Sequence, residues 1–294
     1  ALAQLAVQAG IPAGLVNVVL GDGPVTGNAI TGHPDVAKVS FTGSTGAGQA
    51  IMANVARTGM KPMTLELGGK SPQIVFADAD LNLAADAIAR SILFNAGQAC
   101  VAGSRVIADR RILDDLAARL VERLVPDRAG PTWDVNSAYA PIISDRQLQR
   151  IDSIVTQAVA EGATVLAGGA AMDGAGYFYA PTLLTGVAPD SPAILQEIFG
   201  PVLTLQGFDD DDQALALSDH PTYGLCAGIF TRDLSRAMRA MRRVQAGTVW
   251  INRYGRSRDH ILPTGGYRQS GIGKDLGREA YRANRQSKTV LIDI

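Results

Sequence analysis

The sequence is poor in cysteine, histidine and charged side chains. Two of its 294 residues are cysteines, three are histidines, and 19% are charged, against about a quarter in an average protein. Two cysteines cannot form a disulfide scaffold, and reduced thiols are typical of cytoplasmic proteins. The histidines lie far apart in the chain, with no cysteine or carboxylate at ligand spacing: His33, His220 and His260. We therefore expect a cytoplasmic protein without a metal site.

An excess of charge of either sign is missing as well. The chain has 27 basic and 28 acidic side chains, so its formal net charge is −1, and it contains no basic run. Proteins that bind nucleic acid or a membrane surface through electrostatics carry a basic patch. We therefore expect neither a nucleic acid nor a membrane among its partners.

Long uninterrupted apolar runs are also absent. Residues 1–21 carry no charge, but Gln4, Gly10 and Pro12 break the run, which makes it unsuitable as a transmembrane helix. It lacks the positively charged start of a signal peptide. Because there is no initiator methionine and nothing to cap the helix predicted at 1–9, we expect the chain to begin within a larger protein.

What the sequence does have is a regular alternation of strand-like and helix-like segments, with 47% hydrophobic residues. Its length suits about two domains. The hydrophobic pattern predicts strands at 36–41, 63–67, 71–76, 103–108, 163–167, 202–208, 225–230 and 248–252. Helices are predicted at 49–57, 80–94, 112–124, 144–160, 209–217, 233–244 and 275–284. This alternation predicts an α/β fold with a mostly parallel sheet covered by helices on both faces.

Two further apolar runs, at 15–20 and 289–294, also predict strands. The second contains Val290, Leu291, Ile292 and Ile294, and it is too apolar to stand free as the edge of a sheet. We expect it to dock into another sheet, either in the same chain or in a partner subunit. The alternative is an ordinary C-terminal core strand.

A glycine-rich loop follows the strand predicted at 36–41. Its sequence over 43–48 is GSTGAG. Glycines let backbone N–H groups approach a ligand, and the start of a helix favours an anion such as a pyrophosphate. The spacing matches neither GxGxxG nor the P-loop, so a simple turn between strand and helix is the alternative interpretation.

Two side chains suit covalent chemistry. Glu66 ends an apolar strand before two glycines, and burial there can raise its pKa to ~6–7, which suits a general base. Cys100 follows a predicted helix in a turn of small residues, where a thiolate is a strong nucleophile. An ion-paired glutamate and an inert buried thiol are the alternatives. Cys226 lies within a predicted strand and is expected to act as a small hydrophobic residue.

Polar and aromatic residues at two later turns complete the candidate site. Glu197 and Phe199 precede a Gly-Pro turn, where a carboxylate can face sugar hydroxyls and a ring can face a flat heterocycle. An ordinary turn packed on the core is the alternative. Asn252 ends the strand predicted at 248–252, and the glycines that follow over 263–273 indicate close backbone packing, consistent with a substrate channel.

Together these stretches resemble the NAD(P)-dependent aldehyde dehydrogenase family, over essentially the whole chain. The matching segments are FTGST (41–45), LELGGK (65–70), FNAGQAC (94–100), EIFGPV (197–202), YGL (223–225), GTVWIN (247–252) and PTGGYRQSGIGKDLG (263–277). The resemblance implies the C-terminal part of a Rossmann-type cofactor domain at 1–68 and an α/β catalytic domain at 69–268. It also implies a C-terminal segment at 269–294 whose last strand joins subunits into a homodimer or homotetramer.

The resemblance also implies a role for each motif. Cys100 is the nucleophile that attacks the aldehyde, and its backbone N–H stabilises the oxyanion. Hydride transfer to NAD, or to NADP, leaves a thioester, and Glu66 activates the water that releases the carboxylic acid. Contacts to the cofactor are implied for Gly43, Ser44, Leu67, Gly68, Gln147, Glu197 and Phe199. A substrate channel is implied at Val101, Asn252 and Thr264.

Other interpretations stay open from the sequence alone. Cys100 and Glu66 also suit a thiol esterase that uses no nicotinamide. A CoA-acylating dehydrogenase would use CoA in place of water to release the acyl group from the thioester. Glu66, a residue suited to activating water, argues against CoA. A non-catalytic truncated form is a further alternative. The arginines at 253, 256, 258 and 268 suit a carboxylated aldehyde, although solvated surface arginines are the simpler interpretation.

The family resemblance predicts that these 294 residues alone are inactive or only weakly active. Family members are longer, and upstream they carry an asparagine that is the second oxyanion donor and a lysine that holds the adenosine ribose. Loss of one oxyanion donor costs ~10²–10³ in rate. An assay of the purified chain with NAD and an aldehyde tests this expectation, and near-normal turnover contradicts it.

Overall fold

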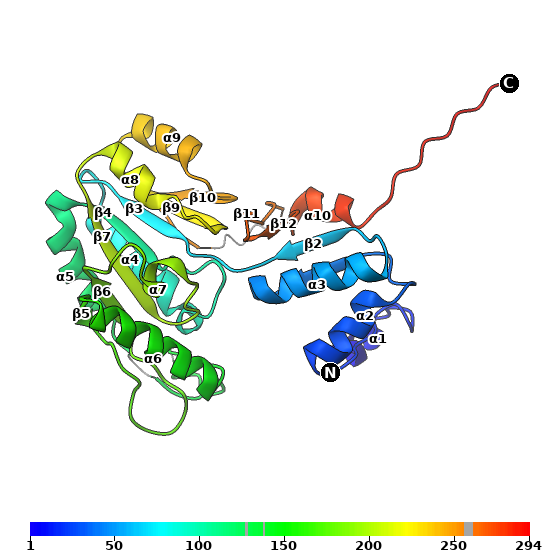
Figure 1. Ribbon diagram of the computed structural model, residues 1–294, viewed down its shortest axis with the longest axis horizontal. Coiled ribbons are helices and arrows are strands. Elements are labelled where there is room, and N and C mark those ends of the chain that lie inside the picture. The colour runs from blue at the N-terminus through cyan, green and yellow to red at the C-terminus, as the bar shows by residue number, and fades with distance from the viewer. Residues whose placement is uncertain (127–128, 138, 256–260) are drawn as a thin grey trace.

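Seven strands form the main sheet of the computed structural model, which describes residues 1–126, 129–137, 139–255 and 261–294 (Figure 1). Their order is β10-β9-β3-β4-β7-β6-β5, and each neighbouring pair is parallel except β5 with β6. The strands are β3 (Pro72–Val75), β4 (Arg105–Asp109), β5 (Thr164–Ala167), β6 (Thr182–Thr185), β7 (Val202–Phe208), β9 (Cys226–Phe230) and β10 (Thr248–Ile251). The predicted mostly parallel α/β class is confirmed.

Helices cover both faces of this sheet because successive strand side chains point to opposite sides. In β3, Val75 packs into one hydrophobic cluster and Ile74 into another. The Val75 side is covered by α4 (Leu81–Leu93) and α5 (Leu113–Arg123), and the Ile74 side by α8 (Asp211–Ser218) and α9 (Leu234–Arg243). A third cluster joins β6 and β7 to α6 (Asp145–Ala160) and α7 (Pro192–Leu195).

A smaller sheet of three strands lies beside the main one, in the order β1-β2-β12 (Figure 1). It contains β1 (Val39–Thr42), β2 (Met63–Glu66) and β12 (Gly271–Ile272), and α3 (Thr45–Thr58) connects the first two strands. β1 and β2 are parallel, whereas β12 runs antiparallel to β2. The strand–helix–strand unit is the arrangement expected of part of a Rossmann-type domain, and a late segment of the chain returns to pair with it.

The remaining elements are short. They are α1 (Leu2–Gln8), the π-helix η1 (Gly23–Gly27), α2 (Asn28–Gly32), the 3₁₀ segments η2 (Phe94–Gly97) and η3 (Arg110–Ile112), β8 (Tyr223–Gly224), β11 (Tyr267–Arg268) and α10 (Gly277–Ala283). β8 and β11 pair antiparallel. No helix in the described part of the chain combines the length and the apolar character needed to cross a membrane.

The strand predicted at 15–20 is wrong. These residues form no strand and are exposed, up to 89% at Leu20. Gly14 and Gly21 on either side have positive φ, and the Asn17 amide donates to Gly14 O, 2.8 Å away. Glycines in that conformation and an amide that closes a turn favour a loop over a strand.

The predicted last strand is wrong for the chain by itself. Residues 289–294 form no strand and extend away from the rest of the fold (Figure 1). Leu291 is 91% exposed, so the run neither docks into a sheet of the same chain nor forms a core strand. An extended apolar run becomes a strand only where a sheet edge lies beside it. Docking onto a partner subunit stays a prediction.

Candidate active site

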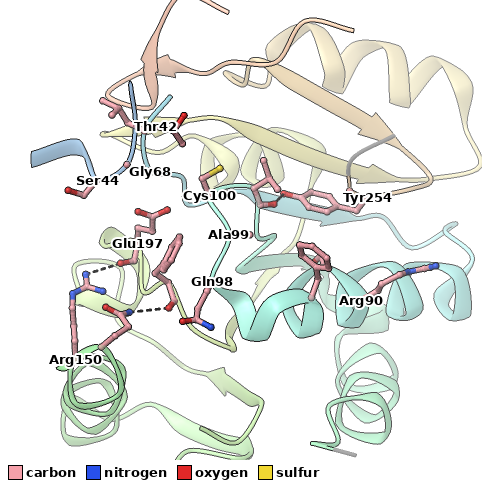
Figure 2. A pocket seen from close by; sticks show the side chains of 18 of the residues that line it. Thr42, Ser44, Gly68, Arg90, Gln98, Ala99, Cys100, Arg150, Glu197 and Tyr254 are labelled. Atoms are coloured by element: carbon pink, nitrogen blue, oxygen red, sulfur yellow. Dashed lines mark hydrogen bonds between the residues drawn. The ribbon is translucent and has the colours of Figure 1, made fainter. Parts of the chain in front are cut away.

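A cavity of about 970 Å³ lies between the ends of β1 and β2 on one side and α4, α6 and the turn before β7 on the other (Figure 2). Its volume is in the range of small-molecule sites. The residues predicted to form the site that do line it are Gly43, Ser44, Leu67, Gly68, Cys100, Val101, Gln147, Glu197 and Phe199. The fold therefore brings together motifs that are far apart in the sequence.

The glycine-rich loop supplies the start of a helix to this cavity. Gly43 and Ser44 line it, and Ser44 caps α3 by accepting a hydrogen bond from Ala47 N at 3.2 Å. Helix N-termini attract anions because their N–H groups are unpaired and the helix dipole is positive there. Because of this cap α3 begins at Thr45, four residues before the predicted start, and Gly48 lies inside the helix against Leu67.

Cys100 follows a turn with an unusual backbone. Asn95, Ala96 and Gly97 all have positive φ, at 50°, 50° and 70°. Such conformations cost of order 1–3 kcal/mol each for residues other than glycine. A Cβ at Gly97 would lie 2.1 Å from Gly200 O, so this turn packs directly on the backbone that follows Glu197. The thiol-bearing segment is thus fixed against the neighbouring turn, and Cys100 itself is partly exposed in the cavity.

Gln98 holds the same turn from its other side. Its side-chain amide donates to Asn95 O at 3.1 Å and to Pro141 O at 3.0 Å, and its Oε1 accepts from Ile143 N at 2.8 Å. All the polar atoms of this buried side chain are therefore used in structure. In the sequence Gln98 was visible only as part of the motif, because its partners Pro141 and Ile143 lie more than forty residues away in the chain.

Glu197 reaches into the cavity over the glycines that follow β2 (Figure 2). Its Oε1 accepts a hydrogen bond from Gly69 N at 3.1 Å. A Cβ at Gly68 would lie 2.4 Å from its Oε2, which explains a glycine at that position. Burial raises the pKa of the Glu197 carboxyl, while the Gly69 N–H and the charges of Lys70 and Arg150 act in the opposite direction.

Lys70 is a buried lysine that sequence reasoning missed as a separate feature. It is 1% exposed, and its Nζ has no hydrogen-bond partner among the described residues. Burial first, and then the positive charge of Arg105, lower the pKa of this amine to about 7, while Glu197 acts to raise it. Arg105 is itself buried and donates to Lys70 O, Leu217 O and Ser218 O.

Glu66 lies beside the cavity and does not line it. It is the last residue of β2 and is 7% exposed. A Cβ at Gly265 would lie 2.6 Å from its Oε1, so the carboxylate is directed toward the glycines of the segment 263–277. The next residue, Leu67, does line the cavity. The structure therefore places the predicted base at the edge of the site.

Two predicted substrate-channel residues have structural contacts elsewhere and do not line the cavity. Asn252 accepts from Thr231 N at 3.0 Å and donates to Thr231 O at 2.9 Å, so its amide joins two chain segments. Thr264 exchanges two backbone hydrogen bonds with Asp275 at 2.7 Å each. A strand-end position in the sequence does not tell which way such a side chain points. Val101 alone of the three predicted channel residues is found in the cavity wall.

The arginines considered for a carboxylated substrate fall only in part within the described residues. Arg268 pairs with Asp219 at 2.8 Å, and it and Arg253 are absent from the cavity wall. Arg256 and Arg258 lie outside the described residues. Tyr254, which was not predicted, does line the cavity beside Cys100, and its hydroxyl donates to Val101 O at 2.9 Å (Figure 2). No metal-binding group of three or more His, Cys, Asp or Glu is found in the part of the chain that the structure describes.

Comparison with known proteins agrees with this geometry. The model of the aldehyde dehydrogenase family matches residues 1–290. A structure of an NAD-dependent aldehyde dehydrogenase from Sinorhizobium meliloti is 42% identical with a TM-score of 0.93, covering 97% of this chain and 56% of its own. An indole-3-acetaldehyde dehydrogenase from P. syringae, solved with NAD+, is 38% identical with a TM-score of 0.95, covering 99% and 59%.

A betaine aldehyde dehydrogenase from Staphylococcus aureus, also solved with NAD+, is 36% identical with a TM-score of 0.90, and the match covers 97% of this chain and 59% of that one. The chain therefore belongs to the aldehyde dehydrogenase family. It spans between half and two thirds of the length of the solved structures it matches.

Two glycine-to-alanine changes should separate backbone packing from side-chain packing. In Gly97→Ala the new Cβ meets the backbone of Gly200 at a positive φ, so we expect the free energy of unfolding to fall by at least ~1 kcal/mol. In Gly68→Ala the Cβ meets only the Glu197 carboxylate, which can turn away, so the loss should be smaller. Urea denaturation of both variants measures this, and equal losses contradict it.

Lys70→Met should remove a pH-dependent contribution to stability. The pKa of Lys70 is about 7 in the folded protein and 10.5 as a reference. Between these values the unfolded chain binds more protons, so the free energy of unfolding of the wild type rises with pH across that window. The variant lacks this rise. We expect the variant to be more stable than the wild type near pH 7, and we expect this difference to shrink as the pH rises toward 10.5.

Denaturation of both proteins at several pH values across the window measures this difference. Other groups that titrate there contribute equally to both proteins and cancel in the comparison. A difference that stays constant with pH would show that Lys70 has an ordinary pKa.

Proposed function

We propose that this chain carries the nucleophile and part of the cofactor site of an NAD(P)-dependent aldehyde dehydrogenase, which oxidises an aldehyde to a carboxylic acid. The observation that carries this proposal is that Cys100 and Glu197 line one cavity together with the N-terminal end of α3. A thiol, an acceptor for sugar hydroxyls and a site for an anion are the three features that such a reaction with a dinucleotide requires.

The residues in the cavity fit NAD. The start of α3, a helix of 14 residues before which Gly43 and Ser44 line the cavity, suits its pyrophosphate. The Glu197 carboxylate suits ribose hydroxyls, and Phe199, which is 37% exposed, suits the nicotinamide ring. Leu67, Gly68 and Gln147 complete the proposed contacts. When bound, NAD supplies the acceptor for the hydride, and NADP stays an alternative.

In the proposed reaction Cys100 acts first. Its thiolate attacks the aldehyde carbon, and the oxyanion that forms is stabilised by the Cys100 backbone N–H. Loss of hydride from the thiohemiacetal leaves a thioester on Cys100. Water then attacks the thioester carbonyl, the carbon–sulfur bond breaks, and the thiolate is regenerated as the acid leaves.

Glu66 is the proposed base for the attacking water. A carboxylate shielded from solvent is a usable base near neutral pH because desolvation favours its neutral form. The side chain is directed toward Gly265, one residue from the cavity wall at Leu67. We propose that it turns about its own side-chain bonds to serve the hydrolytic step.

Partners and location complete the proposal. The substrate is a small aldehyde, and Val101 is the proposed channel residue from the sequence that lies in the cavity. We propose a homodimer or homotetramer, with residues 289–294 pairing with a partner subunit and the regions 1–68, 69–268 and 269–294 as its units. Neither cysteine forms a disulfide in the chain, which supports a cytoplasmic location.

A thiol esterase is the main competing function, and NAD dependence separates the two. A dehydrogenase forms NADH from an aldehyde and an esterase forms none, whereas hydrolysis of p-nitrophenyl acetate without cofactor is expected of both, because both proceed through an acyl group on Cys100. A CoA-acylating dehydrogenase would release an acyl-CoA in place of a free acid. Product analysis with and without NAD and CoA distinguishes these functions.

Glu66→Gln should allow acylation of Cys100 but slow its release. After p-nitrophenyl acetate is mixed with the purified chain, we expect the acyl adduct to persist on Cys100, with deacylation ~10²–10⁴-fold slower than in the wild type. Intact-mass and peptide-mapping measurements over time detect the adduct. Cys226→Ala is the matched control and should behave as the wild type, because Cys226 is buried in β9.

Cys100→Ala should form no adduct in the same experiment. An adduct on Cys226, or wild-type deacylation in Glu66→Gln, would contradict the assigned roles.

A further inference from the structure

The turn that carries Glu197 needs external support. Phe199 has a φ of 56°, a left-handed conformation that costs a non-glycine residue of order 1–3 kcal/mol. Among the described residues, the Glu197 side chain itself is held by one hydrogen bond, from Gly69 N. The position of the carboxylate therefore depends on what fixes the backbone of residues 197–199.

Two side chains of α6 bind this backbone. Gln147 Nε2 donates to Ile198 O at 2.9 Å and to Phe199 O at 3.0 Å. Arg150 donates to Ile198 O at 2.8 Å and to Glu197 O at 2.8 Å. The two residues are three positions apart and so lie on one face of the helix, and Figure 2 shows Arg150 pointing to the turn. Three successive carbonyl oxygens are held in this way.

The same helix is tied to the turn that carries Cys100. The segment that leads into α6 accepts a hydrogen bond from Gln98 at Pro141 O and donates one to Gln98 at Ile143 N. Gly97 packs on Gly200, directly after the Glu197 turn. The contacts therefore close a ring that runs from the Cys100 turn through α6 and the Glu197 turn back to the Cys100 turn.

We infer that Gln147 and Arg150 are positioning residues, which hold the Glu197 carboxylate in the cavity through the backbone of residues 197–199 and thereby set the affinity for the cofactor. This inference rests on the proposed function for its cofactor half. The Arg150 guanidinium donates to main-chain oxygens and forms no ion pair with the Glu197 carboxylate. Its contribution to Glu197 is therefore geometric as well as electrostatic.

The chemistry of the two donors suggests sharp variants. The planar guanidinium reaches two carbonyls at once, which a lysine ammonium on a flexible stem does not reproduce. Arg150→Lys therefore keeps the charge and loses the fork. Gln147→Glu keeps the shape and replaces the donor with a carboxylate that faces two carbonyl oxygens. Gln149→Ala is the control, because Gln149 lies on the same helix and bonds only to Asp145, on the exposed side.

The first measurement is hydrogen–deuterium exchange of the peptide that contains residues 197–202. We expect exchange about tenfold faster in Arg150→Lys and in Gln147→Glu than in the wild type, and no change in Gln149→Ala, since a hydrogen bond to a charged or buried partner stabilises by about a factor of ten. The second measurement is the Kd for NAD, which should also rise about tenfold in Arg150→Lys and in Gln147→Glu. The rate of Cys100 alkylation by iodoacetamide without cofactor should stay within about twofold of the wild type.

Each outcome decides a separate point. Unchanged exchange in both variants overturns the inference. Faster exchange with an unchanged Kd for NAD overturns the claim that the turn sets cofactor affinity. A loss of alkylation and of stability together would indicate a general structural role and also overturns it. If the wild type binds no NAD, the proposed function fails at the cofactor, and the exchange result alone then decides whether α6 positions the turn.

Discussion

Close contact between two backbones is the constraint on which the candidate site depends. The turn before Cys100 and the turn after Glu197 cross where Gly97 meets Gly200, at a separation that leaves no room for a Cβ. One turn presents a thiol and the other a carboxylate, and neither turn has a regular conformation of its own. Their mutual contact, together with α6, converts two irregular segments into a fixed pair. The cavity between them follows from that arrangement.

Three basic side chains act, directly or through one another, on the Glu197 carboxylate behind the cavity. Lys70 and Arg150 both act on Glu197, and Arg105 acts on Lys70. Arg105 binds three backbone oxygens, a common way to stabilise a buried guanidinium, and the negative charge of Asp219 acts to raise its pKa. Burial favours the neutral forms of Glu197 and Lys70. The attraction between their opposite charges favours the charged forms, so each group opposes the pKa shift that burial causes in the other. The positive charge of Lys70 and the negative charge of Glu197 thus offset each other behind the cavity.

Local patterns in the sequence predicted most of the main sheet. Strands such as β7, at 202–208, were located to the residue because a segment rich in apolar residues is bounded by a proline and by acidic residues. Nine of the residues that line the cavity were predicted through motifs, among them Cys100, Gly68 and Glu197. The directions of Asn252, Thr264 and Glu66 could not be predicted, because they depend on partners from distant segments.

The donors of α6 were also beyond local reasoning. Gln147 was predicted to contact the cofactor, yet its side-chain amide donates two hydrogen bonds to the turn. Arg150 had no distinguishing pattern in the sequence, since a basic residue on an exposed helix face is ordinary. At the two ends of the chain apolar composition predicted strands where the fold offers no neighbouring edge. A β-strand requires a second segment to pair with, and the composition of one segment does not tell whether the fold places a partner beside it.

The use of main-chain oxygens by Gln147 and Arg150 has a consequence for mutational tolerance. Every amino acid at position 198 or 199 presents the same carbonyl group, so side chains in the turn can be exchanged without removing the acceptors. The donors have no such freedom, because only a few side chains can span two carbonyls at that distance. A mutational scan should therefore show that these hydrogen bonds are lost on substitution of Gln147 or Arg150 and kept on substitution in the turn, where sensitivity reflects the burial of Ile198 and the ligand contacts proposed for Glu197 and Phe199.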